Sequence, residues 1–115
     1  MRFLMLYRPA KNPAEAGPPS AEHMAEMGRF VEQSRKEGVL LDTGALLPMA
    51  LGARVRRDGS EMSVSHGALP DVQGPVCGYA VIQVGSKEEA IESAKRFLAL
   101  AGEGHSEILP LMDGP

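Results

Sequence analysis

The stretch from residue 38 to residue 96 constrains the fold most, because short apolar segments separated by turn residues lead into one amphipathic helix. Residues 39–43 and 77–84 are dense in apolar side chains, which predicts strands buried within a sheet. Between them, residues 53–57 and 61–66 flank an Asp58-Gly59 turn, which predicts a β-hairpin. Its alternation places Met62, Val64 and His66 on one face. Strands and helices in this mixture indicate an α+β domain.

The helix after this stretch has a start signal and a continuous apolar face. Ser86 and Glu89 form a capping-box pattern, with Ser86 as the N-cap. One helical face then carries apolar residues at positions 90, 91, 94, 97, 98 and 101. Gly102 and Gly104 end the helix, and residues 105–111 are predicted to form a last strand, which Pro110 favours as an edge.

The first third of the chain supplies one more strand and one more helix. Residues 2–7 are predicted to be a central strand, and a helix runs from the N-cap Ser20 to Gly38. The segment 11–20 between them is rich in Pro and Gly, and we expect a loop that covers a pocket. The order strand, helix, strand, hairpin, strand, helix, strand is the split βαβ pattern of a ferredoxin-like fold with an inserted β-hairpin. Both helices should cover one face of the sheet, and a second copy of the chain should cover the other.

Length and composition narrow the classes of protein. The 115 residues fit one domain spanning 1–115, whose modest core favours a homodimer. Twelve basic and fifteen acidic residues are mixed along the chain, with a net charge of −3, so we expect no nucleic-acid partner. Cys77 is the single cysteine, which excludes an intrachain disulfide. The apolar run 3–7 is too short for a signal peptide or a membrane span, so a cytoplasmic protein without a membrane partner is predicted.

Several segments resemble the YCII-related domains, and in particular the branch that carries an Asp-Gly-Pro-Phe signature after the hairpin. These segments are Met1-Arg2-Phe3, Gly38-Val39-Leu40-Leu41, Gly52-Ala53-Arg54-Val55-Arg56, Gly78-Tyr79, Ile82-Gln83-Val84 and Lys87-Glu88-Glu89-Ala90-Ile91-Glu92. The resemblance covers nearly the whole chain. It implies a ferredoxin-like α+β subunit that pairs as a dimeric α/β barrel, with a pocket between sheet and helices. It implies no single activity.

At the signature position this chain reads His66-Gly67-Ala68-Leu69, so only the Gly is kept. The role of the signature Asp therefore falls to His66 or to no residue. Another part of the family is similar around His23, where a histidine on the first helix and a nearby Asp are candidate acid/base partners. One type of member there is similar to lyases that eliminate chloride from muconate-like acids. Asp42, the only carboxylate in its apolar segment, is the candidate partner of His23.

Three residues are therefore candidates for catalysis: His23, Asp42 and His66. An imidazole held by a carboxylate can remove a proton from a carbon next to a carbonyl, because the carboxylate fixes its tautomer and stabilises the imidazolium. Each residue also has a structural interpretation. His23 then flanks an apolar helical stripe, His66 is a strand-end residue bonded to a loop, and Asp42 caps a turn through Gly44.

Substrate binding has its own candidates. Arg54 and Arg56 share one face of the hairpin and are suited to clamp a carboxylate in two-point geometry, although such pairs are more often a solvated strand face or a dimer contact. Tyr79 is the third substrate-binding candidate. The His residues and Cys77 lack paired ligand spacing, so no metal and no cofactor are expected. The methionines, Met24 and Met62 among them, are expected to fill core or pocket walls.

Three functions remain open. The first is a cofactor-free lyase or isomerase that uses His/Asp acid-base chemistry on a small carbonyl or carboxylate compound. The second is a non-catalytic dimer that binds a small ligand or acts as a regulatory accessory. The third is a purely structural dimer. An enzyme requires two titratable groups converging in one pocket, whereas a binding module requires a pocket with one polar anchor.

Overall fold

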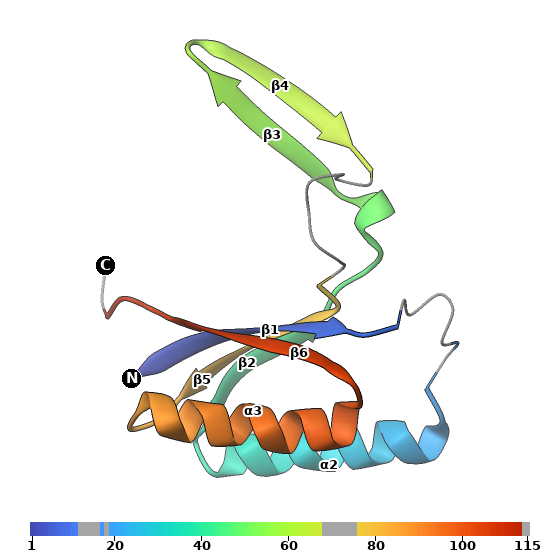
Figure 1. Ribbon diagram of the computed structural model, residues 1–115, viewed down its shortest axis with the longest axis vertical. Helices are drawn as coiled ribbons and strands as arrows, with labels where there is room; N and C mark the ends of the chain where they lie inside the picture. Colours follow the sequence, from blue (N-terminus) through green and yellow to red (C-terminus); the bar gives the residue numbers. More distant parts are fainter. Residues whose placement is uncertain (12–16, 18, 68–75, 114–115) are drawn as a thin grey trace.

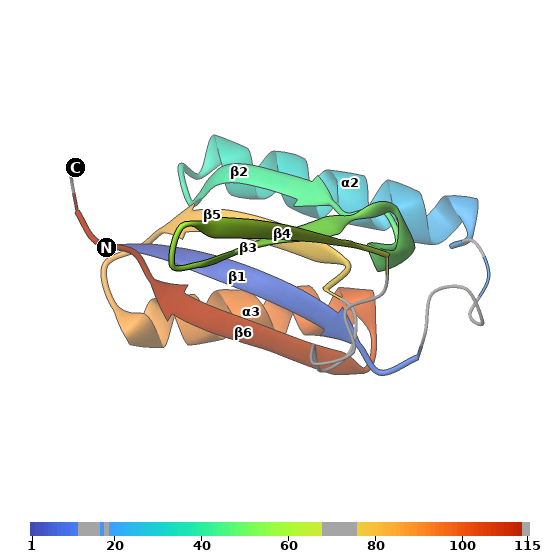
Figure 2. The ribbon, with the colours of Figure 1, turned by 90° about the horizontal axis from the view of Figure 1, so that it is seen from above.

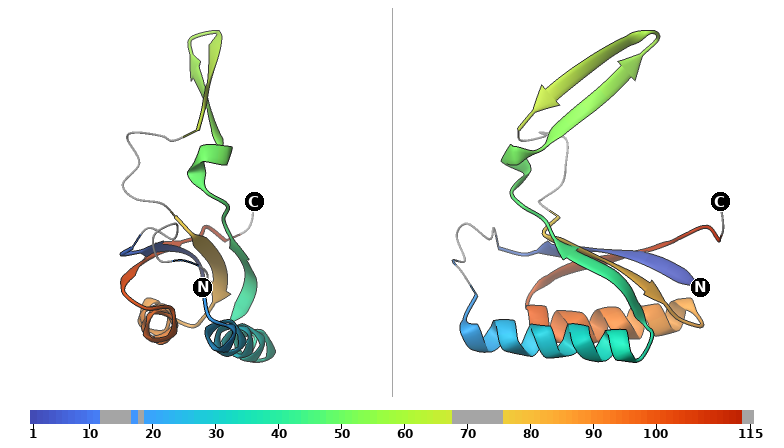
Figure 3. Two further views of the ribbon diagram at one scale, coloured as in Figure 1. Left: turned by 90° about the vertical axis from the view of Figure 1, so that its right-hand side faces the viewer. Right: turned by 180° about the vertical axis from the view of Figure 1, so that it is seen from behind.

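The computed structural model describes residues 1–11, 17, 19–67 and 76–113. It contains a four-stranded sheet in the order β2-β5-β1-β6, with both helices on one face (Figures 1 and 3). The strands of this sheet are β1 (Arg2–Pro9), β2 (Leu40–Ala45), β5 (Gly78–Gln83) and β6 (Gly104–Pro110). The helices are α2 (Ala21–Lys36) and α3 (Lys87–Ala101). The predicted positions of the strands and helices are thus confirmed to within a few residues.

Every neighbouring pair in the sheet is antiparallel, and β5 lies between β1 and β2. This is an α+β arrangement compatible with a ferredoxin-like fold. The central position of β1 and the edge position of β6 are confirmed. The prediction that residues 39–43 form a buried strand was wrong, because β2 is the other edge and Leu41 and Asp42 are exposed. The register shifts between Leu40 and Asp42, as is common at sheet edges.

The core is small and lies between the sheet and α3. Its buried side chains are Phe3, Met5, Ile82, Ala90 and Ala94, and Phe3 is 2% exposed. Phe97 packs edge-on against Tyr7, with ring centroids 5.1 Å apart. The apolar face predicted for residues 90–101 is therefore confirmed, with Ser93 as an additional buried residue.

The helix caps follow from the sequence pattern. Ser20 Oγ accepts a hydrogen bond from His23 N at 3.0 Å, and Ser86 Oγ accepts one from Glu89 N at 3.2 Å. The Glu89 carboxylate reaches one residue further back than in a standard capping box and accepts from Gly85 N at 2.8 Å. These contacts satisfy N–H groups that have no partner within a helix.

The hairpin forms a second, two-stranded sheet that projects away from the body (Figure 1). A short 3₁₀ turn (Met49–Leu51) leads into β3 (Ala53–Asp58), which pairs with β4 (Glu61–His66). The turn residues are Gly59 and Ser60, and Gly59 has φ +63°, which only glycine adopts readily. The predicted hairpin is confirmed, with its turn one residue later than Asp58-Gly59. Viewed from above, the hairpin lies over the face of the main sheet that carries no helix (Figure 2).

Two features of the sequence lie outside the described residues. Residues 12–16 and 18 make up most of the loop that was predicted to cover a pocket. Residues 68–75 include Ala68 and Leu69, where the Asp-Gly-Pro-Phe signature is replaced.

Candidate functional site

The face of the main sheet that carries no helix is called the open face here. Strand alternation places Leu4, Leu6 and Val81 on it, because their neighbours Phe3, Met5 and Ile82 point into the helix-covered core. Leu109 lies opposite Leu4 on β6 and is 44% exposed. The open face therefore has an apolar centre that reaches solvent.

Asp42 and Tyr79 meet on this open face. Tyr79 Oη donates a hydrogen bond to Asp42 Oδ2 at 3.5 Å, while Asp42 Oδ1 accepts from Thr43 N at 2.9 Å. Asp42 does not cap a turn at Gly44, since β2 continues to Ala45. Of the residues predicted for the site, these two are the pair that the single chain brings together. They form a polar anchor beside apolar side chains.

The Tyr79 ring has its place because residue 44 is a glycine. Gly44 lies directly opposite Tyr79 in the sheet, and a Cβ at this position would stand 2.6 Å from Tyr79 Cε1. An aromatic ring covering a cross-strand glycine is a recurrent device in sheets. Gly44 therefore positions the Tyr79 ring beside Asp42, a role that the sequence pattern alone does not predict.

A second polar pair lies on the β6 side of the open face. Arg8 Nε donates to Glu107 Oε1 at 2.6 Å, and Arg8 is the less exposed partner. Glu107 is opposite Leu6 in the β1–β6 register. The apolar centre is thus bordered by Asp42 and Tyr79 on one side and by this ion pair on the other. Nothing in the sequence linked Arg8 with Glu107, which are 99 positions apart.

His23 is not beside Asp42 in the single chain. It lies in the first turn of α2, which packs on the helix-covered face, whereas Asp42 lies on the open face. His23 is half-buried, and its backbone N–H takes part in the Ser20 cap. The sheet therefore separates the two residues that were predicted to act as an acid/base pair.

His66, Arg54 and Arg56 all lie on the projecting hairpin. His66 is the last residue of β4, is exposed, and pairs with Ala53. Arg54 and Arg56 pair with Ser65 and Ser63, so they share the opposite face of the hairpin from His66. The shared face of the two arginines agrees with the sequence. Figure 1 shows that the hairpin holds these residues away from the main sheet.

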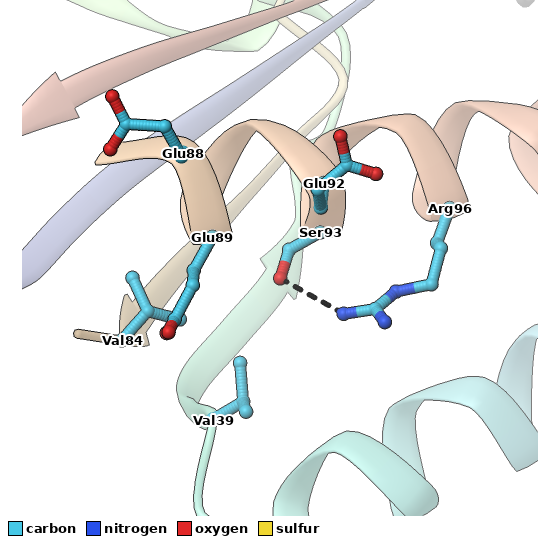
Figure 4. A pocket seen from close by; sticks show the side chains of 7 residues that line it. All are labelled: Val39, Val84, Glu88, Glu89, Glu92, Ser93 and Arg96. Carbon is cyan, nitrogen blue, oxygen red and sulfur yellow. Dashed lines mark hydrogen bonds between the residues drawn. The ribbon is translucent and has the colours of Figure 1, made fainter. Parts of the chain in front are cut away.

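A shallow cavity of about 320 Å³ lies beside α3, away from all of the predicted site residues (Figure 4). It is lined by Val39, Val84, Glu88, Glu89, Glu92, Ser93 and Arg96. Three of its polar groups have structural partners: Glu89 caps α3, and Arg96 donates to Ser93 Oγ at 3.4 Å. Glutamates in the first turn also interact favourably with the helix dipole.

Two groups near the end of β1 have altered acidity. Burial raises the pKa of the Tyr7 hydroxyl, and a nearby Cys77 thiolate raises this pKa further. Burial also raises the pKa of the Cys77 thiol, so it stays protonated and weakly nucleophilic at neutral pH. Neither group carries the character of an activated catalytic residue.

Among the residues that the structure describes, no three His, Cys, Asp or Glu side chains gather in a way that would hold a metal ion. In the same part of the chain, no helix has the length and apolar character needed to cross a membrane.

The fold and the open face define a class of small α+β subunit, with two helices on one side of an antiparallel sheet and a partly polar surface on the other. The family model of the YCII-related domain matches residues 1–113, and the chain belongs to this family. No curated protein matches the chain.

Proposed function

We propose that this protein is a homodimer that binds a small ligand against the open face, with Asp42 and Tyr79 as the polar anchor. The carrying observation is that this pair stands beside Leu4, Leu6 and Val81 on a face with no helix. Ligand sites in proteins typically combine mostly apolar walls with a few well-placed polar groups. A ligand carbonyl would accept from the Tyr79 hydroxyl, and a ligand hydroxyl or amine would donate to Asp42.

The homodimer supports the site because one chain does not enclose it. The described cavity lies beside α3, and the open face is a surface that is accessible on one side. A second copy that covered this face would enclose the ligand site, as in a dimeric α/β barrel.

A second candidate is the cofactor-free lyase or isomerase, and the hydrogen bond between Tyr79 and Asp42 is the observation that favours it. A carboxylate beside a hydroxyl donor is suited to remove a proton from a carbon next to a carbonyl. Asp42 would take this proton, and the Tyr79 hydroxyl would stabilise the charge on the enolate oxygen. His23 and His66 stay predictions as bases, and Arg54 and Arg56 stay predictions as carboxylate ligands. Placement in the Asp-Gly-Pro-Phe branch and a cytoplasmic location also stay predictions.

The test is a ligand-detected NMR screen of small keto acids, hydroxy acids and aldehydes against the wild-type protein and the double variant D42N/Y79F. Compounds that bind the wild type are expected to lose at least about tenfold in affinity to the double variant, which lacks both polar contacts. The matched control is E88Q/E92Q, which changes two glutamates of the α3 cavity. Equal binding to D42N/Y79F, with loss of binding to E88Q/E92Q, would move the site to α3 and contradict the proposal.

Turnover separates the two candidates. If wild-type protein exchanges the carbon-bound protons next to the carbonyl of a bound compound for deuterium, and D42N does not, the enzyme is supported. Binding without exchange supports the non-catalytic dimer.

A further inference from the structure

The chain exposes far more surface than a compact monomer of its size. Its accessible surface is 8439 Å², against about 6,100 Å² expected for a folded 12.3 kDa protein. Its radius of gyration is 16.2 Å, against about 13.3 Å for a compact chain of 115 residues. The excess surface of about 2,300 Å² exceeds the roughly 800 Å² that each partner contributes to a standard interface.

Much of the exposed apolar surface lies on one face of the hairpin. Val55 and Val64 are directly opposite each other, and Met62 is on the same face. Their exposed fractions are 67%, 55% and 65%, respectively. A two-stranded hairpin is marginally stable in water without a surface to pack on. Met62 was expected in a core or pocket wall, and its exposure is a departure that requires a covering partner.

The hairpin and the open face of the same chain do not cover each other. In Figure 2 the hairpin lies over the main sheet, yet Figure 1 shows it held away from that sheet. Apart from Arg54, every residue of β3 and β4 is exposed. Within the described residues, one chain therefore presents two apolar surfaces without a partner. In a two-fold dimer, the hairpin of each copy can cover the open face of the other, so that the same contact forms twice.

We propose that the hairpin of one copy packs its Val55, Met62 and Val64 face on the open face of a second copy, and that the second hairpin does the same in return. This exchange rests on the homodimer proposed above and assigns which surfaces meet in it. His66 shares the face of Met62 and Val64. The exchange therefore brings the partner's His66 to the surface that carries Asp42 and Tyr79, where strand alternation also places His105, opposite Arg8.

The first test uses two neighbouring residues on opposite faces of the hairpin. V64E puts a charge on the apolar face, and S63E puts the same charge on the face of Arg56. We expect V64E to raise the dimer dissociation constant at least about 100-fold, because its carboxylate would be buried against the apolar side chains of the open face, and S63E to change it less than about threefold. Light scattering over a dilution series measures both. Both side chains are exposed in the chain, so the monomer fold is preserved, which far-ultraviolet circular dichroism checks.

The second test asks which chain the hairpin touches. Two single-cysteine chains are made in a Cys77→Ser background, V64C and L109C, and one of them carries a mass tag. Mild oxidation of their mixture should give a disulfide-linked heterodimer in higher yield than a mixture of S63C and L109C. The hairpin exchange is overturned if the wild type is a dimer, V64E is still a dimer, and V64C and L109C give no disulfide-linked product. This outcome leaves the homodimer standing. A wild-type chain that stays monomeric overturns both proposals.

The position of His66 is tested by chemical labelling of wild type and V64E with diethyl pyrocarbonate. His66 should be protected in the dimer and reactive in V64E, while His23, which lies on the helix-covered side, should react alike in both. Equal labelling of His66 in a dimeric and a monomeric sample overturns its placement in the interface.

Discussion

Both faces of the main sheet carry apolar side chains, but their surroundings are very different. On the covered face, Phe3 and Ile82 are buried against α3, and their burial holds the subunit together. On the open face, Leu4 and Val81 lie in the same two strands one residue away, and they reach solvent with Asp42 and Tyr79 beside them. The covered face thus accounts for the fold of one chain, whereas the open face is the surface at which the proposed ligand and second copy would bind.

The largest effect should come from the covered face. Phe3→Ala removes the largest fully buried side chain and is expected to lower the free energy of unfolding by about 3 to 5 kcal/mol. The loss should be the same at all protein concentrations, because Phe3 stabilises the single chain. Leu109→Ala on the open face should cost more at high concentration than at low, since it weakens association. Urea unfolding at two protein concentrations measures both. A concentration-dependent loss for Phe3→Ala would contradict the division between the faces.

A smaller effect is expected at Gly44. In Gly44→Ala the new Cβ would overlap the Tyr79 ring, so the ring must turn away from Asp42, at a cost of about 1 to 2 kcal/mol. Ligand affinity at the open face should also fall, because the Tyr79 hydroxyl moves away from Asp42. Gly28→Ala is the control, because no atom stands near its added Cβ and a helix position gains about 1 kcal/mol from alanine. Unfolding curves of the two variants should therefore move in opposite directions, and a stabilised Gly44→Ala would refute the packing of the ring on Gly44.

Tyr79→Phe should separate binding from folding. The hydroxyl makes one long hydrogen bond to Asp42, so its removal should change the free energy of unfolding by less than about 1 kcal/mol. Affinity for compounds found in the NMR screen should fall at least about tenfold. A variant with unchanged affinity would remove Tyr79 from the anchor and leave Asp42 alone.

The smallest effect is expected on the free energy of unfolding at alkaline pH. Burial raises the pKa of Cys77 above its ordinary 9.0 and that of Tyr7 above 10.0. The unfolded chain therefore loses these protons at a lower pH than the folded chain does. The contribution of the two protonated side chains to the free energy of unfolding is complete below about pH 9, and it declines as pH rises through the folded pKa values. Cys77→Ser should delay the start of this decline toward pH 10. Urea midpoints between pH 7 and pH 11 measure it, and stability that rises with pH in this range would contradict the sign.

The elements were predictable because their signals are local. The Ser86 cap, the apolar spacing of residues 90–101 and the alternation of the hairpin each depend on neighbours in sequence. The edge position of β2 was not predictable from its apolar residues, because pairing with β5 alone is a property of the whole sheet. Asp42 and Tyr79 are both candidates from the sequence. Their contact depends on how β2 pairs with β5, which joins residues 37 positions apart in the chain. The family resemblance pairs His23 with Asp42. The sheet separates the two residues, because His23 lies on α2 on the covered side and Asp42 lies on the open face.

The central claim is that a second copy of the chain covers the open face. Light scattering of the wild-type protein and then of the L6E variant tests it most directly, because Leu6 lies on β1, one of the two central strands of that face. The account predicts twice the chain mass of 12.3 kDa for the wild type and a folded species of the single-chain mass for L6E. A wild-type protein that keeps the single-chain mass at high concentration would contradict it, and so would an L6E variant that dimerises as tightly as the wild type.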